Sequence, residues 1–512
     1  MRFSELLRAL PAELAPATPP PPEADPVVRG LAYDSRRVAP GDCFVALPGD
    51  ATDGHRHLEE ARRLGAVALV VRDPSAAAPL GLPFATLPDT RRALAFLASA
   101  FFGHPSRELS LIGVTGTNGK TSVTYLVESI LTRQGRRTGV IGTVEIRYAG
   151  ERYRTLHTTP ESLDLQQVLR DMCTREVDAA VMEVSSHGVS ASRVAGCRFE
   201  VGAWTNLTQD HLDYHGTMEE YRAAKTRLFS EHLTPSSTAV LNLDDPAAPV
   251  FRAAAERAGA AVLGVSVRGA PEAAVRVRDA RVGLSGTRAT LELPGGPVAV
   301  ELPLVGTFNL ENLAVAAGIA LAFDAPAEAI AAGAAGCPQV PGRMERVAGA
   351  SPEAPAVFVD YAHTPDAVDK LLASLRPLAR GRLIAVFGCG GDRDRTKRPR
   401  MAEAVARYAD RVIATSDNPR TEDPEAILDD LEPGLARLRR VAPEELAAAE
   451  GAFCRITDRR EAIRLAIEVA EPGDTVVIAG KGHEDYQIVG RERIPFDDRE
   501  EARRALVARF GS

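Results

Sequence analysis

Apolar and polar positions along this chain follow a pattern typical of α/β proteins. Short runs rich in β-branched residues occur at 109–116, 138–145, 177–186, 199–208 and 238–245. Between them lie segments whose apolar residues recur three and four positions apart, such as KTSVTYLVESILTRQG, which ends at a glycine. Strands that alternate with helices in this way predict a parallel sheet covered by helices.

A second series of the same kind begins after Pro341 and runs through AVFVDYA, RLIAVFGCGG, RVIATSD, CRITD and DTVVIAG. Ahead of both series, a proline-rich connector (PATPPPPEADP) leads into the strand-like DCFVALPG and AVALVV. A chain of 512 residues exceeds what one core usually organises. We therefore expect an α/β fold with three domains, at residues 1–107, 108–340 and 341–512.

Composition narrows the class of protein. Apolar residues make up 45% and charged residues 25%, with a mean hydropathy of -0.10, as in ordinary globular proteins. The net charge of -8 argues against a nucleic-acid surface. No apolar run is long enough for a membrane span, and the N-terminal MRFSELLRAL lacks a signal-peptide core. We expect a cytoplasmic protein whose six scattered cysteines are buried thiols.

The segment LIGVTGTNGKTS places a glycine-rich turn between a strand and a helix. Backbone N–H groups at such a turn hold phosphates, Lys120 adds a positive charge, and Thr121 offers a hydroxyl to Mg²⁺. Five residues, rather than four, separate Gly113 from the Gly-Lys pair, so this is a variant P-loop. A glycine-rich turn with a chance lysine is the alternative. The predicted ATP-binding residues here are Gly116, Thr117, Asn118, Gly119, Lys120, Thr121 and Ser122.

A carboxylate is predicted near the same edge of the sheet. Glu183 ends the apolar run VDAAVME, and ligands gather at the carboxyl ends of strands in open parallel sheets. Such a buried carboxylate is costly unless it meets a cation or a donor. A capped core glutamate is the alternative. The loop TQDHLDYHG supplies further nitrogen and oxygen ligands in Asp210, His211, Asp213 and His215.

Lysine is rare in this chain, which contains only Lys120, Lys225, Lys370, Lys397 and Lys481. Thr217 and Glu220 form a T-x-x-E box, which predicts a helix from about Met218, and Lys225 falls on its apolar face. Burial lowers the pKa of a lysine and leaves a nucleophilic neutral amine. Such an amine can capture carbon dioxide as a carbamate, which is an oxygen ligand for a metal. The alternative is a lysine that reaches the helix edge or pairs with an aspartate.

Eleven blocks in order resemble the Mur ligases of peptidoglycan synthesis. The likeness runs from YDSRRVAPGDCFVALPGD to the end of the chain and rests on GVTGTNGKTS, HTTP, MEVSSHG, TNLTQDHLDYHGTMEEYRAAKTRLF, LNLDD, GTFNLENLAVAAG, PGRMERV, VDYAHTPDAV, FGCGGDRDRTKRP, SDNPRTEDP and AGKGHEDYQIV. The resemblance implies a uridine-binding first domain, an ATPase middle domain and a Rossmann-like last domain that receives an amino acid.

The resemblance also implies roles for residues of the ATP and metal site. Lys225 would carry a carbamate (N6-carboxylysine) and bind Mg²⁺ together with Thr121, Glu183 and His211. Lys120, Lys225, His211 and Glu183 would be the catalytic residues. Asn309, Arg343 and Asp360 match positions that hold the base, phosphates and ribose of ATP, although helix-cap and turn chemistry would be the better explanation without the family.

The sugar-peptide and amino-acid sites are implied in the same way. Uridine and sugar-peptide contacts would come from Tyr33, Ser35, Asp50, Ala51, Thr52, His157, Thr158, Thr159, Ser185 and Arg193. The chain departs from the family pattern at His157 and Ala191, where asparagine and glutamine would match. The amino-acid pocket would contain Arg393, Asp417, Asn418, Pro419, Arg420, Gly480 and Glu484.

The implied reaction is ATP-dependent addition of an amino acid to UDP-N-acetylmuramoyl-L-alanyl-D-glutamate by way of an acyl phosphate. In DNPR, the Arg420 fork suits a carboxylate and Asp417 suits an ammonium, which favours meso-diaminopimelate over lysine or ornithine. DNPR is also a plausible turn signal. We expect a monomer that uses these small molecules and no nucleic acid.

Three alternative functions deserve comparison with the Mur ligase hypothesis. A folylpolyglutamate or cyanophycin synthetase would share the P-loop and the carbamate but not DNPRTEDP or the uridine-domain block. A P-loop switch or motor would hydrolyse ATP without any amino acid. FGCGGDRD suggests a dinucleotide site, but it lacks the G-x-G-x-x-G spacing, so we interpret it as a loop.

Overall fold

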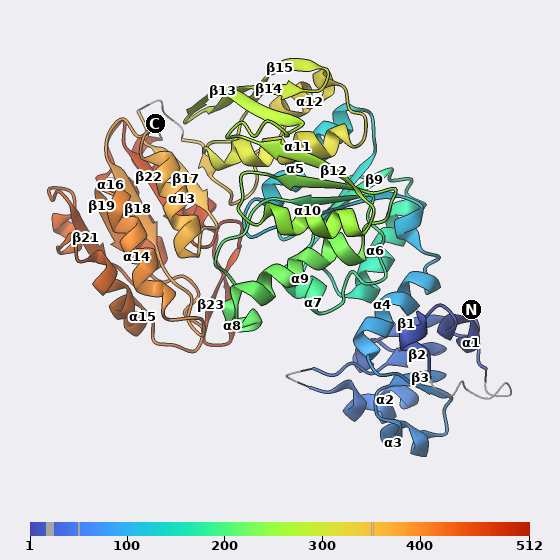
Figure 1. Ribbon diagram of the computed structural model, residues 1–512. Coiled ribbons are helices and arrows are strands. Elements are labelled where there is room, and N and C mark those ends of the chain that lie inside the picture. The colour runs from blue at the N-terminus through green and yellow to red at the C-terminus, as the bar shows by residue number, and fades with distance from the viewer. Residues whose placement is uncertain (17–24, 50–51, 350, 352, 512) are drawn as a thin grey trace.

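The computed structural model describes residues 1–16, 25–49, 52–349, 351 and 353–511 and contains three large sheets. Each sheet is built from one of the three predicted ranges, 1–107, 108–340 and 341–512. The exact domain boundaries stay predictions. The N-terminal body lies at one end of the molecule (Figure 1), where its helix α4 (Thr90–Phe101) contacts α6 (Ser162–Thr174) of the middle body. In the part of the chain described, no helix combines the length and apolarity needed to cross a bilayer.

The N-terminal sheet has four parallel strands in the order β1-β2-β3-β4. Strand β2 is buried along its whole length, and α4 packs on the sheet through Leu94 and Leu97. The strands are β1 (Gly30–Ala32), β2 (Asp42–Val45), β3 (Ala68–Val71) and β4 (Phe84–Thr86), and the α-helices are α1 (Phe3–Leu7), α2 (Leu58–Arg63), α3 (Pro74–Ala77) and α4 (Thr90–Phe101).

The middle sheet has eleven strands, and its centre is parallel as the sequence predicts. The parallel strands lie in the order β12-β11-β10-β5-β9-β6. They are β5 (Ser110–Thr115), β6 (Thr138–Ile141), β9 (Ala179–Glu183), β10 (Val201–Trp204), β11 (Thr238–Asn242) and β12 (Ala261–Ser266).

Further strands extend this sheet at both edges, which the sequence pattern does not predict. Strand β13 joins β12 in parallel, and the remaining added pairs are antiparallel. One edge adds the β13-β14-β15 meander and the other adds the β7-β8 hairpin. Much of β13 and all of β8 are partly or fully exposed, so neither shows a clean apolar run. The strands are β7 (Ile146–Tyr148), β8 (Glu151–Tyr153), β13 (Val275–Gly283), β14 (Gly286–Leu293) and β15 (Gly296–Leu302).

Helices cover both faces of the middle sheet because successive strand residues point to opposite sides. Ile112 and Val114 pack under α5, α11 and α12, whereas Leu111 packs with α6, α9 and α10. On the second face, the rings of Trp204 and Phe251 stack at 3.7 Å. The helices are α5 (Lys120–Arg133), α6 (Ser162–Thr174), α7 (Ser186–Ser190), α8 (Leu212–His215), α9 (Met218–Glu231), α10 (Ala248–Arg257), α11 (Phe308–Leu321) and α12 (Ala327–Ala335).

The C-terminal sheet has the order β16-β17-β22-β18-β19-β21-β20, with a separate β23-β24 hairpin. Helices α13, α14 and α15 cover one face, and α16 and α17 cover the other. The strands are β16 (Glu345–Val347), β17 (Ala356–Asp360), β18 (Leu383–Phe387), β19 (Arg411–Ala414), β20 (Arg439–Arg440), β21 (Ala452–Arg455), β22 (Thr475–Ala479), β23 (Tyr486–Val489) and β24 (Glu492–Pro495). The helices are α13 (Pro365–Leu375), α14 (Lys397–Tyr408), α15 (Pro424–Leu431), α16 (Arg459–Val469) and α17 (Asp498–Phe510).

The predicted state of the cysteines agrees with the structure. All six are free thiols, and five of them are buried. Burial raises the pKa of the Cys197 and Cys389 thiols to about 12, which keeps them protonated and unreactive at neutral pH.

A buried histidine gives the middle domain a pH-dependent stability. Burial lowers the pKa of His232 from 6.5 to about 4, so the unfolded chain binds more protons than the folded one between these values. The contribution of His232 to the free energy of unfolding is therefore complete above pH 6.5. It is lost as the pH falls toward 4, which lowers the free energy of unfolding by about 3 kcal/mol. We expect His232→Gln to remove that part of the acid dependence of the urea midpoint. The control is His57→Gln, which changes a histidine that is only partly buried, and equal slopes in both variants would contradict the prediction.

Candidate active site

The glycine-rich turn after β5 forms the floor of the site. Gly116 and Gly119 adopt positive φ angles of 147° and 88°, a region that costs glycine little. A Cβ on Gly119 would lie 2.2 Å from Asn312 Oδ1. Helix α5 begins at Lys120, whose Nζ donates to the carbonyls of Gly116 at 2.9 Å and Thr117 at 2.8 Å. The glycine-rich turn thus leads directly into the helix N-terminus, and its use as an anion cradle stays a prediction.

Lys225 lies directly beneath this turn. Helix α9 begins at Met218, and the Thr217 side chain caps it by accepting from the Glu220 N–H, although the reciprocal half of a capping box is not formed in these contacts. Lys225 is 1% exposed, and its Nζ donates to the Gly116 carbonyl at 2.9 Å. The predicted burial of this amine is therefore confirmed.

Lys120 and Lys225 donate to the same carbonyl oxygen. Burial, and then the positive charge of Lys120, hold the pKa of Lys225 well below its usual value. The pKa of Lys120 is also lowered by burial. Two ammonium groups at one acceptor repel each other in a low-dielectric interior. Lys225 is consequently the member of the pair that is favoured as a neutral amine.

Glu183 ends β9 as predicted and is 1% exposed. Its carboxylate accepts from the Thr121 hydroxyl at 3.1 Å, from the Thr143 N–H at 2.8 Å and from the Thr143 hydroxyl at 3.0 Å. The adjacent Thr121 hydroxyl and Glu183 carboxylate are hard oxygen donors of the kind that Mg²⁺ takes. This oxygen pair beside the phosphate turn fits a magnesium ion that also contacts nucleotide.

The third residue predicted to bind metal, His211, comes from the loop after β10. His211 adopts a left-handed φ of 53°, and its Nε2 lies 3.4 Å from Asp210 Oδ2. Burial lowers the pKa of His211 to about 4, so the imidazole keeps a free lone pair at neutral pH. Among the described residues, no three His, Cys, Asp or Glu side chains form a metal-binding group.

One cavity of about 560 Å³ joins these groups to the C-terminal domain. Arg343 Nη2 donates to the Thr121 hydroxyl at 3.2 Å, and its guanidinium lies 4.5 Å from the centre of the Tyr361 ring. Asp360 accepts from the N–H groups of Met344 at 2.6 Å and Ala362 at 2.7 Å, while burial raises its pKa. The residues that line the cavity include Lys120, Thr158, Glu183, Ser185, His211, Arg343 and Asp360.

One predicted nucleotide residue, Asn309, stands behind this wall. Asn309 is buried and donates to the Val305 carbonyl at 2.8 Å, while accepting from Asn312 at 2.9 Å. Asn312 itself lines the cavity. In this structure Asn309 therefore positions Asn312, and it does not cap α11.

The predicted sugar-peptide residues form two separate groups. Beside Glu183, the Thr159 hydroxyl lies 3.1 Å from the Ser185 hydroxyl, and Arg193 donates to the Thr159 carbonyl at 2.9 Å. Thr158 faces the cavity, and His157 is exposed nearby. The other group lies on the N-terminal domain, where Tyr33 donates to Asp164 at 2.5 Å, Ser35 to Glu60 at 2.7 Å, and Thr52 lies 3.0 Å from His57. Asp50 and Ala51 lie outside the described residues.

The predicted amino-acid residues meet at the carboxyl ends of β19 and β22. Asn418 donates to Glu484 at 2.9 Å, and Gly480 has a φ of 122°. Asp417 Oδ1 is buried and has no hydrogen-bond partner. Arg420 follows Pro419 with a left-handed φ of 53° and donates to the Gly391 carbonyl at 2.8 Å, whereas Arg393 is exposed on the neighbouring loop.

Known families match the chain in three consecutive segments. A Mur ligase family catalytic domain matches residues 27–105, a Mur ligase middle domain 114–320, and a Mur ligase glutamate ligase domain 342–482. The UDP-N-acetylmuramoyl-L-alanyl-D-glutamate–2,6-diaminopimelate ligase of Gloeobacter violaceus is 48% identical over 94% of each chain. The chain belongs to the Mur ligase family. The ligase of the same name from Synechococcus elongatus is 46% identical over 99% of each chain.

Solved structures agree with this placement of the Mur ligase. A structure of a UDP-N-acetylmuramoyl-L-alanyl-D-glutamate–2,6-diaminopimelate ligase is 35% identical, with a TM-score of 0.68 over the full length of both chains. MurF from Acinetobacter baumannii, at 20% identity and a TM-score of 0.64 over 93% of this chain and 94% of its own, shares the fold.

Several site residues of this Mur ligase were missed by sequence reasoning. Thr143 donates twice to Glu183, and Tyr361 lies against Arg343, but no motif marks either role. Lys481 is 0% exposed, and its Nζ lies 3.0 Å from Glu484, 3.1 Å from Asn418 Oδ1 and 3.6 Å from Asp417. The rarity of lysine was the signal that could have identified it.

Proposed function

We propose that this Mur ligase joins meso-diaminopimelate to UDP-N-acetylmuramoyl-L-alanyl-D-glutamate, acting as a monomer in peptidoglycan precursor synthesis. The observation that carries the proposal is that one cavity contains the phosphate turn, Thr158 and Ser185. A nucleotide held by the turn and a carboxylate held beside Thr158 would face each other across it. That arrangement suits phosphoryl transfer, which depends chiefly on positioning and charge neutralisation.

The reaction has two steps. The bond between the γ-phosphorus and its bridging oxygen breaks as a D-glutamyl carboxylate oxygen bonds to that phosphorus, which gives an acyl phosphate and ADP. The neutral amine of the amino acid then attacks the acyl carbon, phosphate leaves with the C–O electron pair, and the nitrogen loses a proton. Lys120 and Arg343 are placed to neutralise the charge of the phosphates. Thr121, Glu183 and His211 would hold Mg²⁺, which would supply further charge neutralisation when bound.

Lys225 is proposed to act as a carbamate. Its neutral amine attacks carbon dioxide, a C–N bond forms, and one proton is released, leaving a carboxylate at the end of the side chain. This group would supply the anionic ligand that Glu183 and His211 lack. It would also convert the repulsion between Lys225 and Lys120 into attraction.

The choice of amino acid rests on the C-terminal pocket. Among the described residues, Asp417 Oδ1 makes no hydrogen bond and lies 3.6 Å from the Lys481 ammonium, so it can still accept a hydrogen bond from the ammonium of an incoming ligand. Arg420 offers N–H groups for a carboxylate. A distal amino-acid head carries both charges, and meso-diaminopimelate has one. L-lysine and L-ornithine end in an ammonium only and are the alternatives.

An amino-acid panel tests the proposal. The purified protein is incubated with ATP, Mg²⁺, the UDP-sugar dipeptide and meso-diaminopimelate, L-lysine or L-ornithine, and products are identified by mass. We expect phosphate release and a ligated product with diaminopimelate, and at least ~10-fold lower turnover with the others. A product with lysine or ornithine alone would support that alternative. ATP turnover that needs neither dipeptide nor amino acid would favour a switch or motor.

A further inference from the structure

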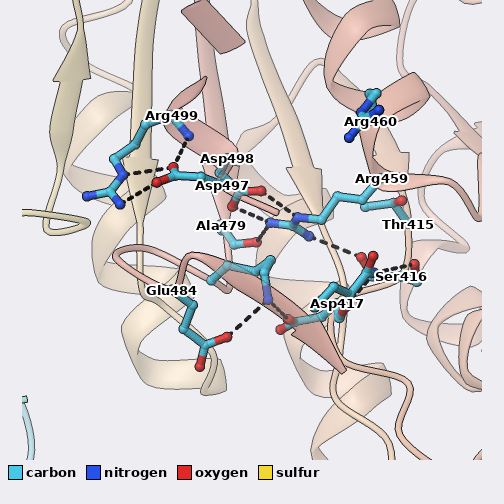
Figure 2. Close-up of polar contacts among 12 residues, drawn as sticks. Thr415, Ser416, Asp417, Arg459, Arg460, Ala479, Glu484, Asp497, Asp498 and Arg499 are labelled. Atoms are coloured by element: carbon cyan, nitrogen blue, oxygen red, sulfur yellow. Dashed lines mark hydrogen bonds and ion pairs between the residues drawn. The ribbon is translucent and has the colours of Figure 1, made fainter. Parts of the chain in front are cut away.

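A buried ion pair joins the last helix to the sheet beneath the amino-acid pocket. Arg459 begins α16 and Asp498 begins α17, and both side chains are 0% exposed. Arg459 Nε and Nη2 donate to the two carboxylate oxygens of Asp498 at 2.7 and 2.8 Å (Figure 2). Such a pair is costly to bury and is weak evidence for stability by itself. Its other contacts indicate what it does.

The remaining N–H groups of Arg459 reach the main chain of two strand ends. Nη2 also donates to the Ala479 carbonyl at 3.0 Å, and Nη1 donates to the Ser416 carbonyl at 3.3 Å. Ala479 is the last residue of β22, and Ser416 follows the end of β19. Each carbonyl shares a rigid peptide plane with the N–H of the next residue. Arg459 therefore fixes the planes from which Gly480 and Asp417 start.

These two strand ends approach each other closely above Arg459. A Cβ on Gly480 would lie 3.1 Å from Asp417 Oδ2 and 3.8 Å from Arg459 Nη2. From this point the chain continues to Lys481 and Glu484, which contact Asn418 on the opposite segment. A shift of either strand end would therefore move the acidic side chains of the pocket relative to one another.

We propose that Arg459, held in place by Asp498, is a positioning residue that sets the geometry of the amino-acid pocket. Only a guanidinium matches this site, because its planar set of N–H groups can donate to one carboxylate and two carbonyls at the same time. A lysine ammonium carries three donors on a single atom and lacks that reach. The inference rests on the proposed function, because it assigns the pocket to the diamino acid.

The N-terminus of α17 also contacts the amino-acid pocket through residues beside the Arg459–Asp498 pair. Asp497 caps α17 by accepting from the Arg499 N–H at 2.8 Å. Arg499 in turn donates to the His483 carbonyl at 3.4 Å and lies 3.6 Å from Glu345. Helix α17 thus contacts the 480–484 segment directly through Arg499, in addition to the link through Arg459.

The test compares Arg459→Lys with Arg382→Lys. Arg382 makes a similar contact with Asp474, at 2.7 and 2.9 Å, but at the opposite ends of β18 and β22. We expect Arg459→Lys to raise KM for meso-diaminopimelate at least ~10-fold, because small misplacements in an active site are costly. KM for ATP should change less than ~2-fold. Arg382→Lys should leave both constants unchanged, whatever its effect on thermal stability.

Asp498→Glu provides a second variant, since it keeps the charge but displaces the guanidinium. An unchanged KM for the amino acid in both folded variants would overturn the proposal, and so would a failure of both to fold, because the pair would then determine the fold rather than the pocket. If the unaltered protein does not use diaminopimelate, the proposed function fails instead. Hydrogen exchange at residues 415–420 and 479–484 still tests the positioning, and we expect faster exchange in Arg459→Lys than in Arg382→Lys.

Discussion

Replacing Lys225 with alanine is expected to abolish ligation, with kcat falling by at least ~10²-fold, the loss typical of removing one preorganised charge-stabilising group. The side chain is buried and donates to the Gly116 carbonyl at the floor of the phosphate turn. Its proposed carbamate would be the anion that balances Lys120. Lys225→Arg should be equally inactive, because arginine keeps the positive charge but does not form a carbamate with carbon dioxide at neutral pH. The measurement is the rate of ligated product at saturating substrates.

Chemical rescue separates the carbamate from a purely structural role. The alanine variant leaves space beneath Gly116, and we expect formate or acetate to restore part of the activity by supplying a carboxylate there. The unaltered protein incubated with ¹³C-bicarbonate should also show a carbamate carbon signal that the variant lacks. Arg227→Ala on the same helix, where Arg227 pairs with Glu231 at 2.8 Å, is the matched control. Full activity in Lys225→Ala would refute the carbamate.

Local sequence patterns predicted the parts of the fold that depend on local chemistry. The buried strands β5, β9 and β22 are continuous apolar runs. The start of α9 follows from the capping Thr217, and the burial of Lys225 follows from helical spacing. The exposed antiparallel strands β13 and β8 were missed because neither face gives a clear alternation. Propensity alone does not specify such strands.

The remaining parts of the site depend on pairings between distant segments. Lys225 meets a carbonyl 109 residues away, and Thr143 meets a carboxylate 40 residues away. The sequence identified Lys225 and Glu183, but it does not reveal that Lys120 shares the acceptor or that Thr143 is the donor. The pair between Arg459 and Asp498 was missed for the same reason. Both residues begin helices, so in the sequence each resembles an ordinary charged residue at a helix start.

Arg420→Ala is expected to raise KM for meso-diaminopimelate by about 10- to 100-fold, while KM for ATP stays nearly constant. A hydrogen bond to a charged group contributes ~1.5–3 kcal/mol, and each ~1.4 kcal/mol is tenfold in affinity. Arg420 is placed for this role beside Asp417 and Asn418 by its left-handed φ of 53° and its contact with Gly391.

The control for Arg420 is Arg395→Ala, which removes an exposed arginine of the same domain that pairs with Asp430 at 2.9 Å. It should change neither constant. The discrimination between diaminopimelate and lysine provides a second readout, because only the former brings a distal carboxylate to the guanidinium. Loss of Arg420 should therefore narrow the preference for diaminopimelate as well as weaken its binding. If KM for ATP rose as much as KM for the amino acid, Arg420 would be a structural residue, and the pocket would have to recognise the carboxylate through Arg393.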